Sequence, residues 1–241
     1  MNSVAIAIEN KSSVLTDDEV RGAIPALQHQ VSYDFKPYWN EGARLVWVPS
    51  GSSPPSGAGA WLLSILDDSD QAGALGYHDV TPDNTPLMKV FAKTDQDNSL
   101  SWTVTASHEI LEALADPWIN SAWQTSNTEF VALEVGDPVE ADELGYAIDG
   151  VEVSDFILPA WFVSGLKVPK YDFAGHLSGP LQVASGGYIS IFVSGKGWTQ
   201  KQMRDGRLVD AERDEDDPRF RDRSVTNALT PSEAVPLTIQ A

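Results

Sequence analysis

The chain of 241 residues contains no cysteine and few basic residues. Without cysteine, disulfide bonds, a thiolate nucleophile and a cysteine-bound zinc ion are excluded. Any metal site must therefore use histidine, aspartate and glutamate. The 16 lysine and arginine residues stand against 35 aspartate and glutamate residues, which gives a formal net charge of −19. Because such a surface repels nucleic acid and anionic lipid, we expect neither as a partner.

Targeting and nucleotide-binding signals are also missing from the sequence. No apolar run approaches the roughly 18 residues that a transmembrane helix needs. The segment from Met1 to Glu9 has neither a basic region nor a long apolar region. We therefore expect no signal peptide, and a location in the cytoplasm or in a virion. A Walker loop and a dinucleotide-binding fingerprint are both absent, which argues against nucleotide chemistry.

The composition is that of a globular domain, with 42% hydrophobic and 21% charged residues. In the first half, short apolar runs predict strands, and Thr16-Asp-Asp-Glu19 is a capping box that starts a helix. A loop rich in glycine, serine and proline is expected over residues 51–59. The predicted strands cover residues 4–8, 44–49, 61–66 and 87–92. Strand, helix and three more strands indicate one mixed sheet.

The second half begins with the clearest helix of the chain, predicted over residues 101–115. Pro117 ends it, because the residue before a proline disfavours helical geometry. Residues 145–153 predict a hairpin around an Asp149-Gly150 turn, and residues 188–193 predict a further strand. The fold class expected from these elements is α+β, with a β-rich C-terminal part.

The C-terminal residues differ in composition from the rest. Residues 201–223 alternate both charge signs densely, which predicts a solvated helix or loop with many ion pairs. Residues 224–241 carry one charge and two prolines. We expect them to form an extended tail that lies along its own domain or is disordered, although a neighbouring molecule is a further packing partner. The predicted division is a domain over residues 1–200 and an appendage over residues 201–241.

The strongest functional signal is the segment His108-Glu109-Ile110-Leu111-Glu112. On a helix, His108 and Glu112 lie one turn apart on nearly the same face. They flank an apolar stripe, so we expect them to be anchored by the core and open to a cleft. Glu109 projects toward the same opening. This is the H-E-x-x-H zinc geometry with glutamate in place of the second histidine.

A catalytic zinc site has three protein ligands and one position open for water. We expect His108 and Glu112 to bind the metal, and Glu109 to take a proton from the water that attacks a polarised carbonyl. Because H-E-x-x-E also occurs by chance on helices, a third ligand is decisive. Glu134 and Asp137 are the candidates, one as ligand and the other as a partner that orients His108 through its free ring nitrogen. Spacing does not assign these two roles.

Several short motifs follow one another around this helix. They are Gly76-Tyr-His-Asp79, Val90-Phe-Ala-Lys93, Ser107-His108-Glu109, Glu112, Asp116-Pro117, Trp123 and Glu134-Val-Gly-Asp137. From Ser107 onward the order resembles the S-H-E-x-x-E-x-x-x-D-P…W…E-[IV]-G-D pattern of a zincin-like metallopeptidase family. That pattern is found in bacterial and phage proteins and, more distantly, in secreted plant proteins of the exordium type. The resemblance extends over roughly residues 75–162.

The resemblance implies a zincin-like mixed sheet with an active-site helix. It also implies one Zn²⁺ ion on His108, Glu112 and a carboxylate from residues 134–137. The chain departs from the pattern at Pro138, where secreted relatives often have cysteine. It also lacks the second histidine of proven metallopeptidases, and a glutamate ligand makes zinc a weaker Lewis acid.

The other histidines are weaker candidates. His78 lies ahead of the predicted strand over residues 87–92, which we expect to form the edge of the cleft and to pair with an extended peptide. His78 either stabilises an oxyanion or forms a hydrogen bond within a loop. His29 is expected at the surface, and His176 is a loop histidine that is a possible distal ligand.

Two functions from different classes follow from the sequence. The first is a zinc-dependent hydrolase of the zincin type, which cuts peptide bonds in a peptide or protein substrate with Glu109 as the general base. The second is a structural or assembly protein on the same scaffold, for example a phage virion subunit. Its partners would be neighbouring subunits, and the metal would brace the fold.

Overall fold

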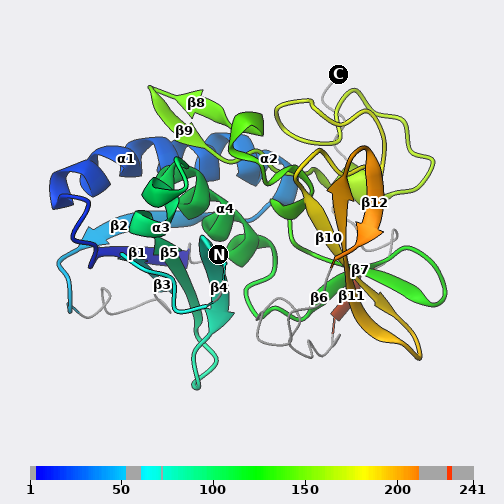
Figure 1. Ribbon diagram of the computed structural model, residues 1–241, viewed down its shortest axis with the longest axis horizontal. Coiled ribbons are helices and arrows are strands. Elements are labelled where there is room, and N and C mark those ends of the chain that lie inside the picture. The colour runs from blue at the N-terminus through cyan, green and yellow to red at the C-terminus, as the bar shows by residue number, and fades with distance from the viewer. Residues whose placement is uncertain (1–3, 53–60, 72, 212–226, 230–241) are drawn as a thin grey trace.

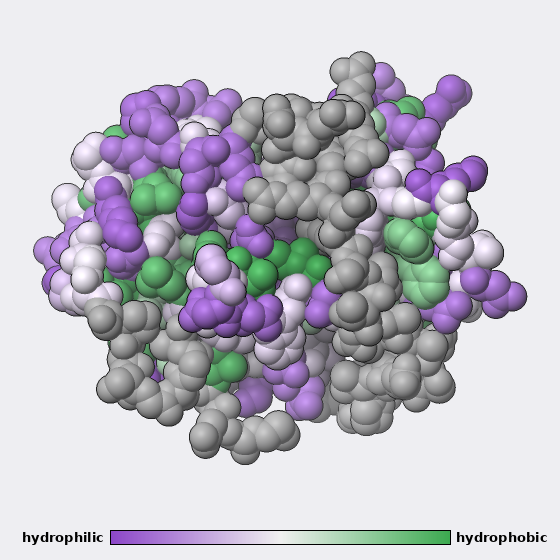
Figure 2. All heavy atoms as spheres, turned by 90° about the horizontal axis from the view of Figure 1, so that it is seen from below, coloured by the Kyte–Doolittle hydropathy of each residue, from purple (hydrophilic) through white to green (hydrophobic). Residues whose placement is uncertain are grey.

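The computed structural model describes residues 4–52, 61–71, 73–211 and 227–229 (Figure 1). It shows a mixed α/β protein built around two larger sheets. Within the described residues, no helix is long and apolar enough to cross a membrane. Hydrophilic side chains are frequent at both ends of the face shown in Figure 2, and a group of hydrophobic ones appears toward its middle.

The first sheet has five strands in the order β2-β1-β3-β5-β4. Four of them are parallel, and they confirm the four predicted strands; they are β1 (Val4–Asn10), β2 (Ala43–Val48), β3 (Trp61–Leu66) and β5 (Pro86–Phe91). The sequence did not predict β4 (Gly76–Val80), which pairs antiparallel with β5 and forms the edge. The expectation that residues 87–92 form the edge is therefore wrong. Most of the loop expected over residues 51–59 lies outside the described residues.

Helix α1 (Asp17–His29) begins at the predicted capping box. The backbone N–H of Thr16 donates to Glu19 Oε2 at 2.7 Å, and the backbone N–H of Glu19 donates to Thr16 Oγ1 at 3.2 Å. The helix continues into a π-helical stretch (Gln30–Phe35) and the short helix α2 (Lys36–Trp39). Helix α1 packs on β2, so it covers one end of the sheet (Figure 1).

Helix α4 (Trp102–Ala115) confirms the predicted helix over residues 101–115, and it follows the short helix α3 (Ala92–Asp97). It packs on β4 and β5, beside α1 (Figure 1). Every residue from 103 to 114 is buried. The polar residues of this helix are thus more buried than expected, because the C-terminal half of the chain covers that side as well, although His108 and Glu109 line a pocket.

The second sheet has the order β12-β11-β10-β7-β6-β13. Its strands are β6 (Ser121–Gln124), β7 (Glu129–Ala132), β10 (Tyr188–Val193), β11 (Gly197–Arg204), β12 (Arg207–Asp210) and β13 (Asn227–Leu229). Strand β10 confirms the strand predicted over residues 188–193. Strand β13 pairs in parallel with β6, so this part of the tail lies along its own domain. Residues 224–226 and 230–241 of the predicted tail lie outside the described residues.

Strands β11 and β12 correct the prediction of a helix or loop over residues 201–223. The described part of this segment is a hairpin whose turn, Asp205-Gly206, has φ angles of 49° and 72°. The alternating charges lie on paired strands, where Lys201 Nζ meets Asp210 Oδ1 at 2.8 Å across the hairpin. Strand β11 continues through residue 200, so the predicted domain boundary falls inside a strand. Residues 212–223 lie outside the described part.

Between β7 and β10, residues 133–187 form a segment with little regular structure. It contains the hairpin of β8 (Tyr146–Ile148) and β9 (Val151–Val153), which confirms the prediction for residues 145–153. The positive φ angles at Asp149 (51°) and Gly150 (85°) form the expected turn. Although irregular, much of the segment is buried, and its Phe156 packs on Phe35 of the π-helical stretch that follows α1. This packing brings the loop after β7 against helix α4.

Candidate metal centre

Helix α4 supplies three ionisable side chains to one buried place. His108 is 8% exposed, Glu109 5% and Glu112 4%. Burying charged groups costs several kcal/mol each unless they are paired or bind a cation. His108 Nε2 lies 3.3 Å from Glu112 Oε1, as the predicted i, i+4 spacing requires. The helix therefore holds a histidine and a carboxylate side by side without further support.

Strand β4 brings His78 to the same place. Its side chain is 5% exposed, and Nδ1 lies 3.5 Å from both Glu109 Oε2 and Glu112 Oε2. Its Nε2 lies 3.5 Å from Glu134 Oε2. The sequence analysis did not identify β4 as a strand. A signal for it was present in the turn-forming residues Thr81-Pro-Asp-Asn-Thr-Pro86, which form the tight turn between β4 and β5; there the N–H of Thr81 donates to the carbonyl of Thr85 at 2.9 Å.

The loop after β7 brings Glu134 and Asp137 against the helix. Gly136 allows this approach, because a Cβ at that position would lie 2.5–2.9 Å from atoms of the His108 ring. Its N–H donates to Glu112 Oε1 at 3.1 Å. Asp137 Oδ1 lies 3.5 Å from His108 Nε2. All four predicted metal ligands and both predicted catalytic residues therefore meet in one cluster.

The geometry separates the two carboxylates whose roles the sequence left open. Asp137 and Glu112 face the same nitrogen of His108, Nε2. A partner that orients the ring through its free nitrogen would instead face Nδ1. Asp137 thus lies on the side of the ring where a ligand belongs, whereas Glu134 faces His78.

Two groups of three side chains can hold a metal ion here, and they share Glu112. One is His108, Glu112 and Asp137, and the other is His78, Glu112 and Glu134; within each, the ligand atoms lie within 4.8 Å of one another. The separations of 3.3–3.5 Å between ring nitrogens and carboxylate oxygens exceed the usual hydrogen-bond length of about 2.7–3.2 Å. Ligands about 2.0–2.1 Å from a tetrahedral zinc ion are about 3.3–3.4 Å apart. The donor set and its spacing suit a divalent metal ion.

The electrostatics of the first group reflect the same proximity. Burial by itself lowers the pKa of His108, but the neighbouring Glu112 and Asp137 outweigh it and raise this pKa well above its usual value. Burial and the negative charge of Glu112 raise the pKa of Asp137. The pKa of Glu112 is lowered despite its burial, because His108 and the N–H of Gly136 stabilise the carboxylate. Glu112 and Asp137 thus compete for the positive charge of His108. A bound cation would reduce the repulsion between the two carboxylates.

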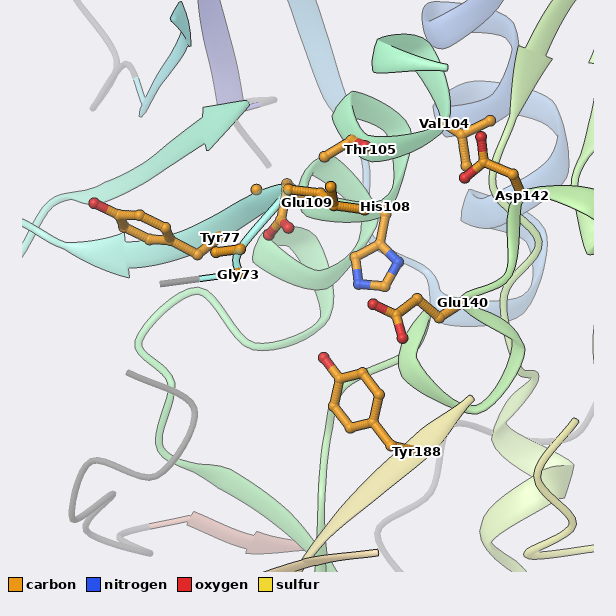
Figure 3. Close-up of a pocket in the computed structure, with 12 residues that line it drawn as sticks. Gly73, Tyr77, Val104, Thr105, His108, Glu109, Glu140, Asp142 and Tyr188 are labelled. Carbon is orange, nitrogen blue, oxygen red and sulfur yellow. The ribbon is translucent and has the colours of Figure 1, made fainter. Parts of the chain in front are cut away.

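A pocket reaches this cluster from outside. His108 and Glu109 form part of its wall, and Tyr77, Glu140 and Tyr188 line it as well. Figure 3 shows the side chains of Glu140 and Tyr188 pointing toward the His108 ring from the side opposite to α4. A substrate in this pocket would lie next to the predicted base and one predicted ligand.

A third group lies apart from α4 and was not predicted. It consists of Asp155, Asp172 and His176, and its ligand atoms also lie within 4.8 Å of one another. Asp172 accepts backbone hydrogen bonds from residues 175, 176 and 177 at 2.6–2.8 Å, so it closes a loop. His176 Nε2 contacts the carbonyl of Leu144 at 2.9 Å. His176, named as a possible distal ligand, therefore belongs to this group and not to the α4 cluster.

Comparison of the chain with protein-family models, with curated proteins and with solved structures gives no match.

Proposed function

We propose that the protein is a zinc-dependent hydrolase of the zincin type that cleaves peptide bonds. His108, Glu112 and Asp137 would hold the zinc ion, and Glu109 would act as the general base. The observation that carries this proposal is that two carboxylate oxygens, Glu112 Oε1 and Asp137 Oδ1, lie 3.3 and 3.5 Å from the same nitrogen, His108 Nε2. Their two-sided support, from helix α4 and from the 134–137 loop, provides the rigid donor set that a catalytic metal needs.

A zinc ion bound there would supply Lewis-acid polarisation of a substrate carbonyl and lower the pKa of water. Glu109 lies one residue after the first ligand and lines the pocket. Its Oε2 is buried and accepts no hydrogen bond from any described residue, and the ionisable group that faces it is His78 Nδ1 at 3.5 Å. Glu109 thus combines access to the pocket with an available acceptor atom.

His78 fits the predicted oxyanion role less well. An oxyanion donor must direct an N–H toward the place where negative charge develops. Both ring nitrogens of His78 face carboxylates, Nδ1 toward Glu109 and Glu112 and Nε2 toward Glu134. This arrangement favours a role within the carboxylate cluster.

Metal analysis and a base variant test the proposal together. We expect purified protein to contain zinc, to lose stability in chelator, and to cleave members of a peptide library detected by mass spectrometry. Glu109→Gln should retain the metal and lower cleavage at least 100-fold. The exposed Glu143→Gln is the matched control and should behave as wild type. Absence of bound metal, with unchanged stability in chelator, would refute the proposal.

The second candidate function is a structural or assembly protein in which the metal braces the fold. It is favoured by the origin of the ligands, since α4 packs on the first sheet and the 134–137 loop follows a strand of the second. An ion there would join the two layers. In this case Glu109→Gln changes nothing measurable, and chelator unfolds the protein. A multimer lost on deletion of residues 224–241 would also support this function.

A further inference from the structure

Glu112 directs its two carboxylate oxygens toward different histidines. Oε1 lies 3.3 Å from His108 Nε2, and Oε2 lies 3.5 Å from His78 Nδ1. The side chain of Glu112 is 5% exposed, so neither oxygen faces open solvent. A carboxylate placed between two donor sets in this way has the geometry of a bridge between two cations.

The donor set of His78, Glu112 and Glu134 is as buried as the set of His108, Glu112 and Asp137. The side chains of His78, Glu112 and Glu134 are 5%, 5% and 4% exposed. Their ligand atoms can be chosen so that all lie within 4.8 Å of one another. The set comes from three elements (β4, α4 and the loop after β7), and the loop and the helix also supply the first set. The two positions are therefore built by the same packing.

Charge balance calls for positive charge beyond that of one divalent ion. Within the described residues, the only cationic side chains within 4.0 Å of Glu109, Glu112 and Asp137 are His78 and His108. When both histidines act as ligands they are neutral, and these three buried carboxylates carry a charge of −3. One divalent ion offsets two of these charges. Buried charge that remains unbalanced is costly, so either a protonated His78 or a second bound cation must offset the rest.

We infer that the site binds a second divalent cation on His78, Glu112 and Glu134, with Glu112 bridging the two ions. This inference rests on the proposed function, because the first ion occupies the position assigned there. Imidazole and carboxylate donors suit Zn²⁺ or Mn²⁺. Paired metal ions about 3.5–4 Å apart are found in hydrolases such as aminopeptidases and phosphatases, where both ions stabilise the attacking and leaving oxygens. His78 is then a metal ligand.

The alternative without a second ion is a protonated His78 that pairs with the surrounding carboxylates. The number of metal ions per chain distinguishes the two. The full chain is equilibrated with zinc at a buffered free concentration, and bound zinc is measured by mass spectrometry of the metal. We expect two zinc ions per chain for wild type.

Two conservative variants separate the positions. Glu134→Gln should lower the stoichiometry from two zinc ions per chain to one. Asp137→Asn should instead weaken the binding of the first ion, on His108 and Glu112. The exposed His29→Ala is the matched control for loss of a histidine and should retain two ions, since its side chain is 50% exposed and lies elsewhere. If Glu134→Gln fails to fold, His78→Asn replaces it, with circular dichroism as the check on folding.

Manganese provides a second measurement. Two Mn²⁺ ions bridged by Glu112 should give an exchange-coupled electron paramagnetic resonance spectrum, and Glu134→Gln should give the spectrum of an isolated ion. One ion in both wild type and Glu134→Gln overturns the second site and leaves the proposed function standing. Two bound ions in both wild type and Glu134→Gln would overturn the assignment of Glu134 as a ligand. No bound ion in wild type overturns the proposed function as well.

Discussion

The two walls of the metal centre are built in different ways. Helix α4 presents His108, Glu109 and Glu112 through the regular geometry of one turn, and these residues would adopt the same spacing on any helix. The segment from residue 133 to 162 presents Glu134 and Asp137 from an irregular chain, held by contacts with residues far away in the sequence. Both walls are nevertheless almost completely buried. The comparison shows that ligand placement on the irregular wall depends on packing.

The largest effect is expected from the core of the irregular wall. Phe156 is fully buried, and its ring lies 5.3 Å from that of Phe35 and 5.2 Å from that of Phe173. We expect Phe156→Ala to lower the free energy of unfolding by about 3–5 kcal/mol, because it leaves a cavity. Leu111→Ala in α4 is the comparison, with about 2–5 kcal/mol expected. Urea denaturation measures both, and a loss below about 1 kcal/mol for Phe156→Ala would show that the segment is not part of the core.

The contact between the two walls is the next most sensitive place. In Gly136→Ala the new Cβ would lie 2.5–2.9 Å from the His108 ring, which forces the loop and the helix apart. We expect a loss of about 1–3 kcal/mol and at least a tenfold weaker affinity for zinc, measured by calorimetric titration. Gly179→Ala is the control, since a Cβ there meets nothing within 4 Å. Unchanged zinc affinity in Gly136→Ala would contradict the proposed arrangement.

Behind the helical wall, the short helix α3 holds a buried acid, Asp95, whose titration can be predicted. Burial raises the pKa of Asp95 to about 7 from 3.8, although Thr105 of α4 donates a hydrogen bond to it. Between about pH 4 and 7 the folded protein retains a proton that the unfolded chain has lost, so stability falls as the pH rises through this range. Asp95→Asn should remove this dependence and stabilise the protein by about 1–2 kcal/mol at pH 8. Thermal unfolding at pH 5 and pH 8 measures the change. An equal loss of stability between these two pH values in the variant and in wild type would contradict the raised pKa.

The smallest effect is expected where local sequence alone decides the structure. Thr16→Ala removes one half of the capping box of α1 and should cost about 1 kcal/mol. It should leave the zinc affinity unchanged, because α1 supplies no ligand. A change in metal content would mean that the α1 layer influences the site more than the comparison of the two walls suggests.

Regular elements were predictable because their signals are local. The capping box at Thr16, the end of α4 before Pro117 and the Asp149-Gly150 turn each depend on a few neighbouring residues. Strand β4 was missed because its sequence, Gly-Tyr-His-Asp-Val, contains no apolar run. This composition agrees with its position at the edge of the sheet, where all five residues are half-buried. The hairpin of β11 and β12 was missed because its dense charges are typical of solvated helices and loops. In both cases pairing with a neighbouring strand determined the structure.

The sequence by itself determined which residues of α4 can act together, since three and four residues along a helix always bring side chains to one face. It also named Glu134 and Asp137 as candidates, without assigning a role to either. Only the tertiary structure placed Asp137 beside His108 and brought His78 and Glu134 to the other side of Glu112. The reason is that these residues come from separate elements, whose approach depends on the packing of the core and on the missing side chain of Gly136.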